Sequence, residues 1–343
     1  MKNDQPQFES RWPHRIGCLL VCTIFPLILV GNLVTTTDAG MAVPDWPNTY
    51  GYNLFLYPYR EWFFGPWDLF VEHGHRLLGS LAGLISIVLV VATYRSSSRV
   101  WVKHLSAFVL GLVVFQGVLG GVRVVFDERF IAKIHGCVGP LFFASSVLFC
   151  VVTSRWWSNS ESAAVDVRGW FASWIPKLAV FMLLVSFCQL ALGAFIRHID
   201  DMASPKQFTL LVAMHILTAV LLVAGTLLQF ALTRRSDLKR MGLKGSINIL
   251  MLLILVQFSL GLGTWVVKWG WPVWFENYGW AAKFVILEKS FFQVNVVTAH
   301  AAVGSLVLAF WTVHAIRANR VFYSGRGDKM MGFADAAVPS SIN

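Results

Sequence analysis

Four of the nine histidines lie inside long apolar segments, each close to one end of its segment. These are His75, His135, His215 and His300. His75 and His135 lie about five residues from the end, whereas His215 and His300 lie about eight and ten residues in, so at about 1.5 Å per helical residue the second pair is deeper. Ionisable side chains are costly at such depths in a membrane, and we expect all four to be functional.

The five remaining histidines are expected outside any site. They are His14, His73, His104, His198 and His314. Four of them fall at the ends of apolar segments, where we expect solvated or interfacial side chains. The fifth, His73, is two residues from His75 and therefore points to a different face of the same helix.

Two imidazoles on separate helices suit the two axial positions of haem iron. Zinc and copper sites usually need three or four ligands close together, often with cysteine or carboxylate. Near the first pair, Gly79, Gly136 and Gly139 leave room for a flat ring. A single histidine in a membrane helix can be an ordinary hydrogen-bond partner, but four histidines matched in depth favour haem binding.

A carboxylate and a guanidinium accompany the first pair only. Glu72 precedes His75 by three residues and shares its helix face, and Arg76 follows directly. Glu72 could carry protons or stabilise a developing cation. Alternatively, it could pair with Arg76, or orient a ligand histidine. Arg76 could bind a haem propionate, because guanidinium suits bidentate contact with carboxylate. The residues before His215 and His300 include no such acid, so the two pairs should differ in function.

Membrane-spanning helices must position these side chains. The chain has 343 residues, of which 56% are hydrophobic and only 13% charged, and its mean hydropathy is +0.62. Spanning the hydrocarbon core takes about 20 apolar residues. Runs of that length predict an all-α polytopic membrane protein with eight helices, near 16–35, 71–94, 101–122, 130–153, 174–197, 208–232, 247–268 and 291–316. The first run is too long for a signal-peptide core, so we expect a retained helix.

The distribution of Lys and Arg predicts the orientation. With the N-terminus inside, 18 of the 28 basic residues but only 7 of the 18 acidic residues fall in cytoplasmic segments. This asymmetry places both termini in the cytoplasm, and the short N-terminal tail with its two acidic residues favours a bacterial plasma membrane. The net charge of +10 is therefore a topology signal. It fits a lipid bilayer as partner and gives no reason to expect nucleic acid.

Three odd-numbered helices share a Gln-x-x-Leu-Gly pattern near their outward ends. The matches are Gln116 to Gly120, Gln189 to Gly193 and Gln257 to Gly261, with a fainter version at Gly31-Asn32-Leu33-Val34. Each pattern is followed by an even-numbered helix that carries one of the four histidines. Glycine lets helices approach closely, and glutamine can hydrogen-bond across a bundle. The repeat predicts two pseudo-symmetric four-helix bundles, in residues 1–160 and 161–343.

At these residues the chain resembles the haem A synthase family of cytochrome oxidase assembly proteins, over about residues 16–316. The most specific matches are Glu72-x-x-His75-Arg76-Leu77-Leu78-Gly79, Pro44-Asp45-Trp46-Pro47, Gln116-x-x-Leu119-Gly120 with His135-Gly136, and His300 before Ala301-Ala302-Val303-Gly304. Members of that family oxidise a ring methyl of haem O to the formyl group of haem A. The family architecture is two pseudo-symmetric four-helix bundles.

The resemblance implies a role for each histidine pair, with all four as axial ligands of haem iron. His75 and His135 would bind the substrate haem O in the N-terminal bundle, and Arg76 would lie beside them. Glu72 matches the functionally important acid and would be catalytic. The deeper pair, His215 and His300, would hold a haem b cofactor in the C-terminal bundle. Expected partners are haem O synthase and cytochrome oxidase assembly factors, and a homo-oligomer is compatible with the sequence.

Two other functions fit four buried histidines. A di-haem membrane electron-transfer cytochrome would hold two permanent haems and would need no acid beside one pair. A haem-handling chaperone or exporter would bind haem without changing it. The chain also departs from its relatives at two points. Some members carry a cysteine pair in the first outer loop, whereas residues 36–70 contain no cysteine, and relatives commonly have an Arg or Asn near Thr36, where this chain reads Thr35-Thr36-Thr37.

Overall fold

The computed structural model describes residues 10–159, 173–200, 202–235, 242–271 and 288–335. Eight of its helices are long and apolar enough to cross a membrane. They are α1 (Trp12–Thr36), α3 (Trp67–Ser96), α4 (Val100–Phe126), α5 (Arg129–Val152), α7 (Trp174–Arg197), α8 (Pro205–Arg235), α9 (Leu243–Trp269) and α10 (Phe291–Asp335). Shorter helical segments are η1 (Ala39–Met41), α2 (Tyr59–Phe64) and α6 (Arg155–Asn159). The predicted all-α membrane fold is confirmed.

The helices extend a few residues beyond the predicted apolar runs. For example, α3 begins at Trp67, four residues before the predicted start at 71. Pro66 precedes the first residue and Asp68 lies in the first turn, and both features favour a helix start. The apolar run identifies the part of a helix that lies in hydrocarbon, whereas the helix itself ends where its capping residues allow.

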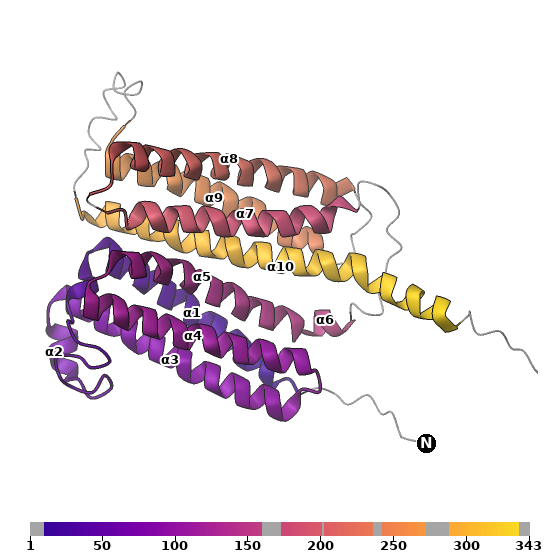
Figure 1. The fold of residues 1–343 in the computed structure, drawn as a ribbon, viewed down its shortest axis with the longest axis horizontal. Coiled ribbons are helices and arrows are strands. Elements are labelled where there is room, and N and C mark those ends of the chain that lie inside the picture. The colour runs from indigo at the N-terminus through magenta and orange to yellow at the C-terminus, as the bar shows by residue number, and fades with distance from the viewer. Residues whose placement is uncertain (1–9, 160–172, 201, 236–241, 272–287, 336–343) are drawn as a thin grey trace, which may run out of the picture.

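The long helices form two groups of four with the same order of neighbours (Figure 1). In the first group α1 contacts α3, α3 contacts α4, α4 contacts α5, and α5 closes the ring on α1. The second group repeats this order with α7, α8, α9 and α10. The arrangement is consistent with pseudo-symmetric bundles, and the boundary predicted at residue 160 lies outside the described residues.

The buried apolar cores lie at the end of each bundle where α1 begins, which we call the N-terminus side. In the first bundle the core includes Leu20, Leu89 and Phe149. In the second bundle it includes Ile175 and Trp311. Residues of these cores come from the first halves of α1, α4, α7 and α9, from the second halves of α3, α5 and α8, and from residues 307–321 of α10. The opposite ends of the bundles carry His75, His135, His215 and His300 and lie outside these two cores. We call these ends the histidine side.

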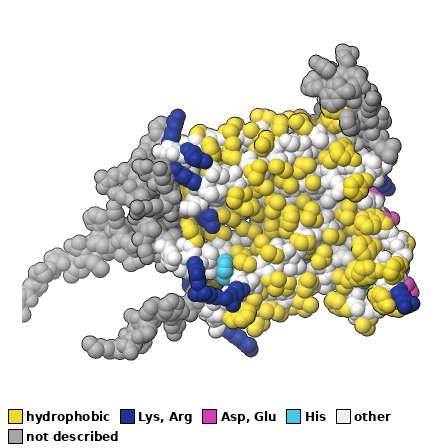
Figure 2. Space-filling model, turned by 180° about the vertical axis from the view of Figure 1, so that it is seen from behind, with side chains coloured by type: hydrophobic (Ala, Val, Ile, Leu, Met, Phe, Trp, Pro, Cys, Tyr) yellow, Lys and Arg dark blue, Asp and Glu magenta, His cyan; other side chains and the backbone are white. Residues whose placement is uncertain are grey.

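The surface carries a broad apolar belt (Figure 2). Lys and Arg side chains gather at the N-terminus side of the belt, at the left of the view, as the predicted charge asymmetry requires. Large side chains that are exposed to the surroundings include Leu84, Val88, Leu217 and Leu255, all within spanning helices. Such residues would be unfavourable in water but match lipid, so the protein is a multi-pass membrane protein.

Candidate functional site

The structure brings the four predicted histidines together as two pairs. His75 of α3 faces His135 of α5, with 6.5 Å between ring centroids and 75° between ring planes. His215 of α8 faces His300 of α10 in nearly the same way, at 6.4 Å and 76°. Each pair joins the second and fourth helices of its bundle and lies on the histidine side. The depths differ less than predicted, because α3 starts earlier and places His75 eight residues after Trp67.

Both pairs have the spacing that a metal ion between two imidazoles requires. An imidazole nitrogen bound to a first-row metal lies about 2 Å from it, and a ring centroid lies roughly 1 Å beyond the nitrogen. The expected separation of centroids is therefore about 6 Å, close to both observed values. Groups of three or more metal-binding side chains do not occur among the described residues, so the donor set fits a haem iron better than zinc.

One nitrogen of every ring has no hydrogen-bond partner. The Nδ1 atoms of all four histidines are buried without a partner in the described part of the chain. In every ring this nitrogen lies against the backbone of the preceding helix, beside a glycine. Each ring would therefore offer its other nitrogen, Nε2, to a ligand.

A glycine of the preceding helix lies directly against each histidine ring. The pairs are Gly31 with His75, Gly120 with His135, Gly193 with His215, and Gly261 with His300. A Cβ atom on Gly31 would lie 2.7 Å from Cε1 of its histidine, and the other three would lie 3.2–3.3 Å away. Three of these glycines end the repeated Gln-x-x-Leu-Gly pattern, and Gly31 begins its fainter version. The physical meaning of the pattern is therefore close approach of a helix backbone to a histidine ring.

The repeated glutamines also reach the neighbouring helix, as predicted. Gln116 Nε2 donates to the carbonyl oxygen of His135 over 2.9 Å. Gln189 Nε2 lies 3.2 Å from Nε2 of His215. The amide of Gln257 lies beside Gly304, four residues from His300. Each glutamine thus fixes the helix segment that carries a histidine.

The three glycines expected to leave room for a ring behave differently from one another. Gly79 faces open space, because a Cβ atom on it would meet no other atom within 4 Å. A Cβ on Gly136 would touch Ala194 of the other bundle at 3.6 Å, and one on Gly139 would meet Gln116 at 3.0 Å. Of the three, only Gly79 thus faces open space, whereas Gly136 and Gly139 lie at helix contacts.

Glu72 and Arg76 hold the first outer loop. Glu72 is 3% exposed; its Oε1 accepts a hydrogen bond from Arg76 at 2.8 Å and its Oε2 accepts one from the backbone N–H of Val43 at 2.9 Å. Arg76 also donates to the carbonyl oxygens of Val43, Asp45 and Asn48. Of the alternatives for Glu72, the ion pair with Arg76 is the one seen. Its acceptor capacity is not exhausted, because a carboxylate has about four lone-pair positions.

The same loop is tied down by further contacts that the sequence did not predict. The ring of His73 is 2% exposed and its Nδ1 lies 3.0 Å from the hydroxyl of Thr49. The ring of Trp46 lies on Gly121 of α4, next to the glycine under His135. Asp45 accepts hydrogen bonds from the backbone of Tyr50 and Gly51. Burial opposes ionisation of Asp45, but these N–H donors and Arg76 lower its pKa overall. The loop therefore forms a fixed cover over the first pair.

The expectation for His314 is wrong. Its side chain is fully buried between α8, α9 and α10, with Nε2 2.8 Å from Gln229 Nε2 and Nδ1 2.8 Å from the hydroxyl of Ser246. A polar cluster of this kind cannot be foreseen from one helix, because its partners come from two others. With both nitrogens paired, His314 is a structural residue.

Polar side chains connect the two bundles on the histidine side. Arg197 at the end of α7 donates to the side-chain oxygen of Asn32 at 2.5 Å, to its carbonyl oxygen at 2.6 Å and to the hydroxyl of Thr36. Thr298 of α10 donates to the same hydroxyl at 3.2 Å. Since Asn32 follows the glycine under His75, the second bundle fixes the part of α1 that supports the first pair.

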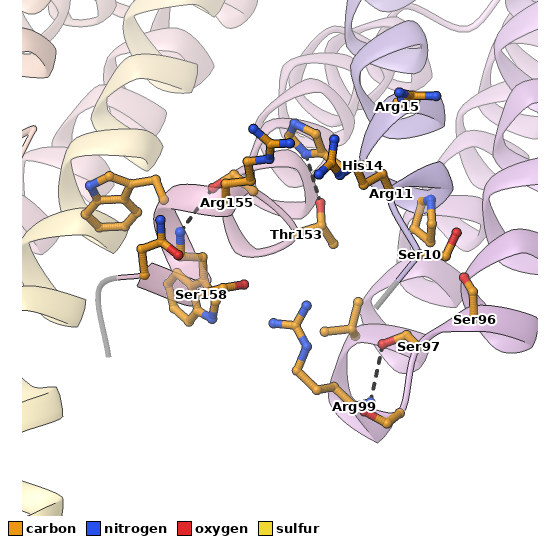
Figure 3. A pocket seen from close by; sticks show the side chains of 17 residues that line it. Ser10, Arg11, His14, Arg15, Ser96, Ser97, Arg99, Thr153, Arg155 and Ser158 are labelled. Atoms are coloured by element: carbon orange, nitrogen blue, oxygen red, sulfur yellow. Dashed lines mark hydrogen bonds between the residues drawn. The ribbon is translucent and has the colours of Figure 1, made fainter. Parts of the chain in front are cut away.

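A large cavity lies at the other end of the first bundle, away from both pairs. It has a volume of about 1300 Å³ and is lined by residues that include Arg11, His14, Arg99 and Arg155 (Figure 3). Arg99 donates to the carbonyl oxygen of Val152. These basic residues lie at the N-terminus side, where the orientation rule expects them, so the cavity gives no separate evidence for a site.

Comparison with known proteins agrees with this geometry. Residues 66–212 match the family model described as Cytochrome oxidase assembly protein. This segment is similar to that family and makes up less than half of the chain. It includes Glu72, Arg76 and the first histidine pair and ends three residues before His215, and the match supports the family predicted from the sequence.

Several relatives named Heme A synthase are similar to this chain. The one from Shouchella clausii is 24% identical over 199 residues, covering 57% of this chain and 62% of the relative. The one from Alkalihalophilus pseudofirmus is 27% identical over 200 residues, covering 57% and 61%. The one from Symbiobacterium thermophilum is 29% identical over 181 residues, covering 50% and 55%. The matched regions therefore span less than two thirds of these relatives.

Proposed function

We propose that this protein is a haem A synthase that oxidises a ring methyl of haem O to the formyl group of haem A. The observation that supports this most strongly is the inequality of two otherwise matching histidine pairs. Both pairs fit an axial pair of iron ligands, but only the first has a buried acid, Glu72, beside it and an ordered loop over it. A di-haem electron-transfer cytochrome has no need of that difference.

In this proposal His75 and His135 hold the substrate haem O, and His215 and His300 hold a resident haem b. When bound, the haem groups supply the redox chemistry of their iron. Oxidation of a methyl to a formyl group removes four electrons and four protons, which we assign to two successive hydroxylations through an alcohol and a hydrated aldehyde. Each hydroxylation would take its oxygen atom from water and pass two electrons and two protons to an external redox acceptor, and the hydrated aldehyde would then lose one water to give the formyl group. The histidine pair orients the substrate, and the loop held by Glu72 and Arg76 excludes water from it.

Glu72 is proposed to accept or stabilise positive charge near the reacting methyl. A carboxylate has about four lone-pair positions, and the present hydrogen bonds of Glu72 occupy only two of them. Glu72→Gln keeps the shape of the side chain but removes the charge. We expect it to lower haem A formation at least tenfold, with haem O affinity changed less than threefold. A variant with unchanged haem A formation would exclude this role.

The cellular setting follows from the charge asymmetry. We propose a bacterial plasma membrane, with both termini cytoplasmic and the histidine side outward. Haem O would come from a haem O synthase, and haem A would pass to cytochrome oxidase assembly factors.

The test is coexpression with a haem O synthase, followed by chromatography of the extracted haems. A formyl-bearing haem that requires this protein supports the proposal. Haem O that stays unchanged would indicate a carrier, and a preparation that contains haem B alone would indicate an electron-transfer cytochrome. Either of these last two results would overturn the proposed function. His75→Ala is the matched control, because it should abolish the formyl product without removing the protein from the membrane.

A further inference from the structure

Arg76, which the sequence suggests as the partner of a haem propionate, already donates hydrogen bonds to other groups of the protein. Arg76 donates to one carboxylate oxygen and three carbonyl oxygens, at 2.6–2.9 Å. A guanidinium has five N–H donors, so only one remains. Bidentate contact with a propionate would require Arg76 to release the loop over the first pair. A haem O bound there needs another cation for its carboxylates.

Arg123 is a cation at the first pair without a partner. It lies in the last turn of α4, three residues beyond the glycine that contacts His135. Within the described residues it makes no hydrogen bond or ion pair, although it is only partly exposed. A partly exposed guanidinium with no acceptor in the described part of the chain has its N–H donors available for an acceptor from outside it.

Arg123 packs against the outer loop that Glu72 holds. Its Nη2 atom packs against Gly40 of η1 so closely that a Cβ atom on that glycine would overlap it. The guanidinium therefore lies against this loop, on the helix turn that follows the glycine in contact with His135.

The second bundle has no cation at the position equivalent to Arg123; its nearest counterpart, Lys268, lies one turn further along α9, over the ring of Trp269. By the repeat, the residue three positions beyond Gly261 is Thr264, whose hydroxyl is buried without a partner in the described part of the chain. Arg197, which ends α7 at a similar distance from its glycine, is committed to Asn32 and Thr36. A cation at a helix C-terminus commonly complements the helix dipole. That role alone does not explain why the guanidinium of Arg123 packs against Gly40 in the outer loop.

We propose that Arg123 binds a propionate carboxylate of the haem O held by His75 and His135. The inference rests on the proposed function for the identity of that haem. Arg123 would be a binding residue, and Arg76 would position the loop. A charge-assisted hydrogen bond between guanidinium and carboxylate would satisfy both groups away from water.

The experiment compares haem O with its dimethyl ester, in which both propionates are esterified. The full chain in detergent is titrated with each compound, and binding is followed by the Soret absorption. His135→Ala shows which part of the signal belongs to the first pair. The variants are Arg123→Gln and Arg123→Lys, and Lys133→Gln is the matched control. Lys133 lies in the first turns of α5, where it contacts the ring of Phe195, so this control removes a charge on the same side of the protein.

We expect the wild type to bind haem O roughly 10- to 100-fold more tightly than the ester. Arg123→Gln should bind haem O more weakly by a similar factor and should distinguish the two compounds by less than about threefold. Arg123→Lys should keep part of the preference, and Lys133→Gln should keep all of it. Because the result is a ratio of affinities within one variant, partial misfolding cancels.

An Arg123→Gln variant with the full preference for haem O over its ester would overturn the proposal. So would a Lys133→Gln variant that loses the preference to the same degree. The titration needs no turnover and is therefore independent of the product analysis. A wild type that binds haem O with this preference but forms no haem A would refute the proposed function and leave the binding role of Arg123 intact.

Discussion

Adding one methyl group at Gly31 should disable the first histidine pair while the protein remains folded. In Gly31→Ala the new Cβ would lie 2.7 Å from Cε1 of His75. Carbon atoms in good contact are about 3.5–4.0 Å apart, so the ring must move by roughly 1 Å. A histidine ring can turn aside at little cost to folding, but its nitrogen then no longer faces His135.

The size of the effect follows from that displacement. Overpacking in a fitted site costs about 1–3 kcal/mol, and each 1.4 kcal/mol is a factor of ten in affinity. Haem affinity at the first pair should therefore fall by roughly 5- to 150-fold. A Cβ atom on Gly261 would lie 3.2 Å from Cε1 of His300, so a movement of that ring by a few tenths of an ångström would relieve the contact. Gly261→Ala should therefore lower haem affinity at the second pair by less than tenfold.

The assay is haem titration of each purified variant, with haem per protein read from reduced-minus-oxidised spectra. Gly111→Ala is the control, since a Cβ there meets no atom within 4 Å and the position faces outward from α4. The reasoning fails if Gly31→Ala binds haem within twofold of the wild type. It also fails if Gly111→Ala causes an equal loss.

Three further changes test other parts of the structure. Arg197→Ala removes the bonds to Asn32 that join the bundles, and should cost about 2–4 kcal/mol in denaturant unfolding; a change under 0.5 kcal/mol would contradict the bridge. Burial and neighbouring cations lower the pKa of His198 to about 4, below about 6.5 in the unfolded chain. The unfolded state therefore binds more protons between these values, so stability should fall as pH drops from about 6.5 toward 4, and His198→Gln should flatten that decline. Arg76→Gln should speed hydrogen exchange of residues 43–49 at least tenfold, and unchanged exchange would show that the loop has other anchors.

The features that depend on periodicity could be predicted from the sequence. Apolar runs predicted all eight spanning helices, because the hydrocarbon core dictates both their length and their composition. The repeated Gln-x-x-Leu-Gly pattern led to the two histidine pairs. Its glycines proved to lie against the histidine rings, which is a more specific role than close helix packing.

The features that depend on contacts between distant segments could not be predicted. Arg76 looked available for a propionate, but loop carbonyls about thirty residues earlier in the chain take up its donors. Arg123 carried no signal because it ends a helix as many cations do. Its meaning depends on the lack of an acceptor among the described residues, which only the three-dimensional arrangement reveals.

The most direct test of the account is the identity of the haem that each histidine pair retains. His75→Ala and His300→Ala would be purified from cells that make haem O, and the bound haems would be extracted and separated by chromatography. We expect His75→Ala to keep haem b and to lack haem O and haem A, and His300→Ala to lose haem b. Loss of the same haem from both variants would contradict the division into a substrate site and a cofactor site.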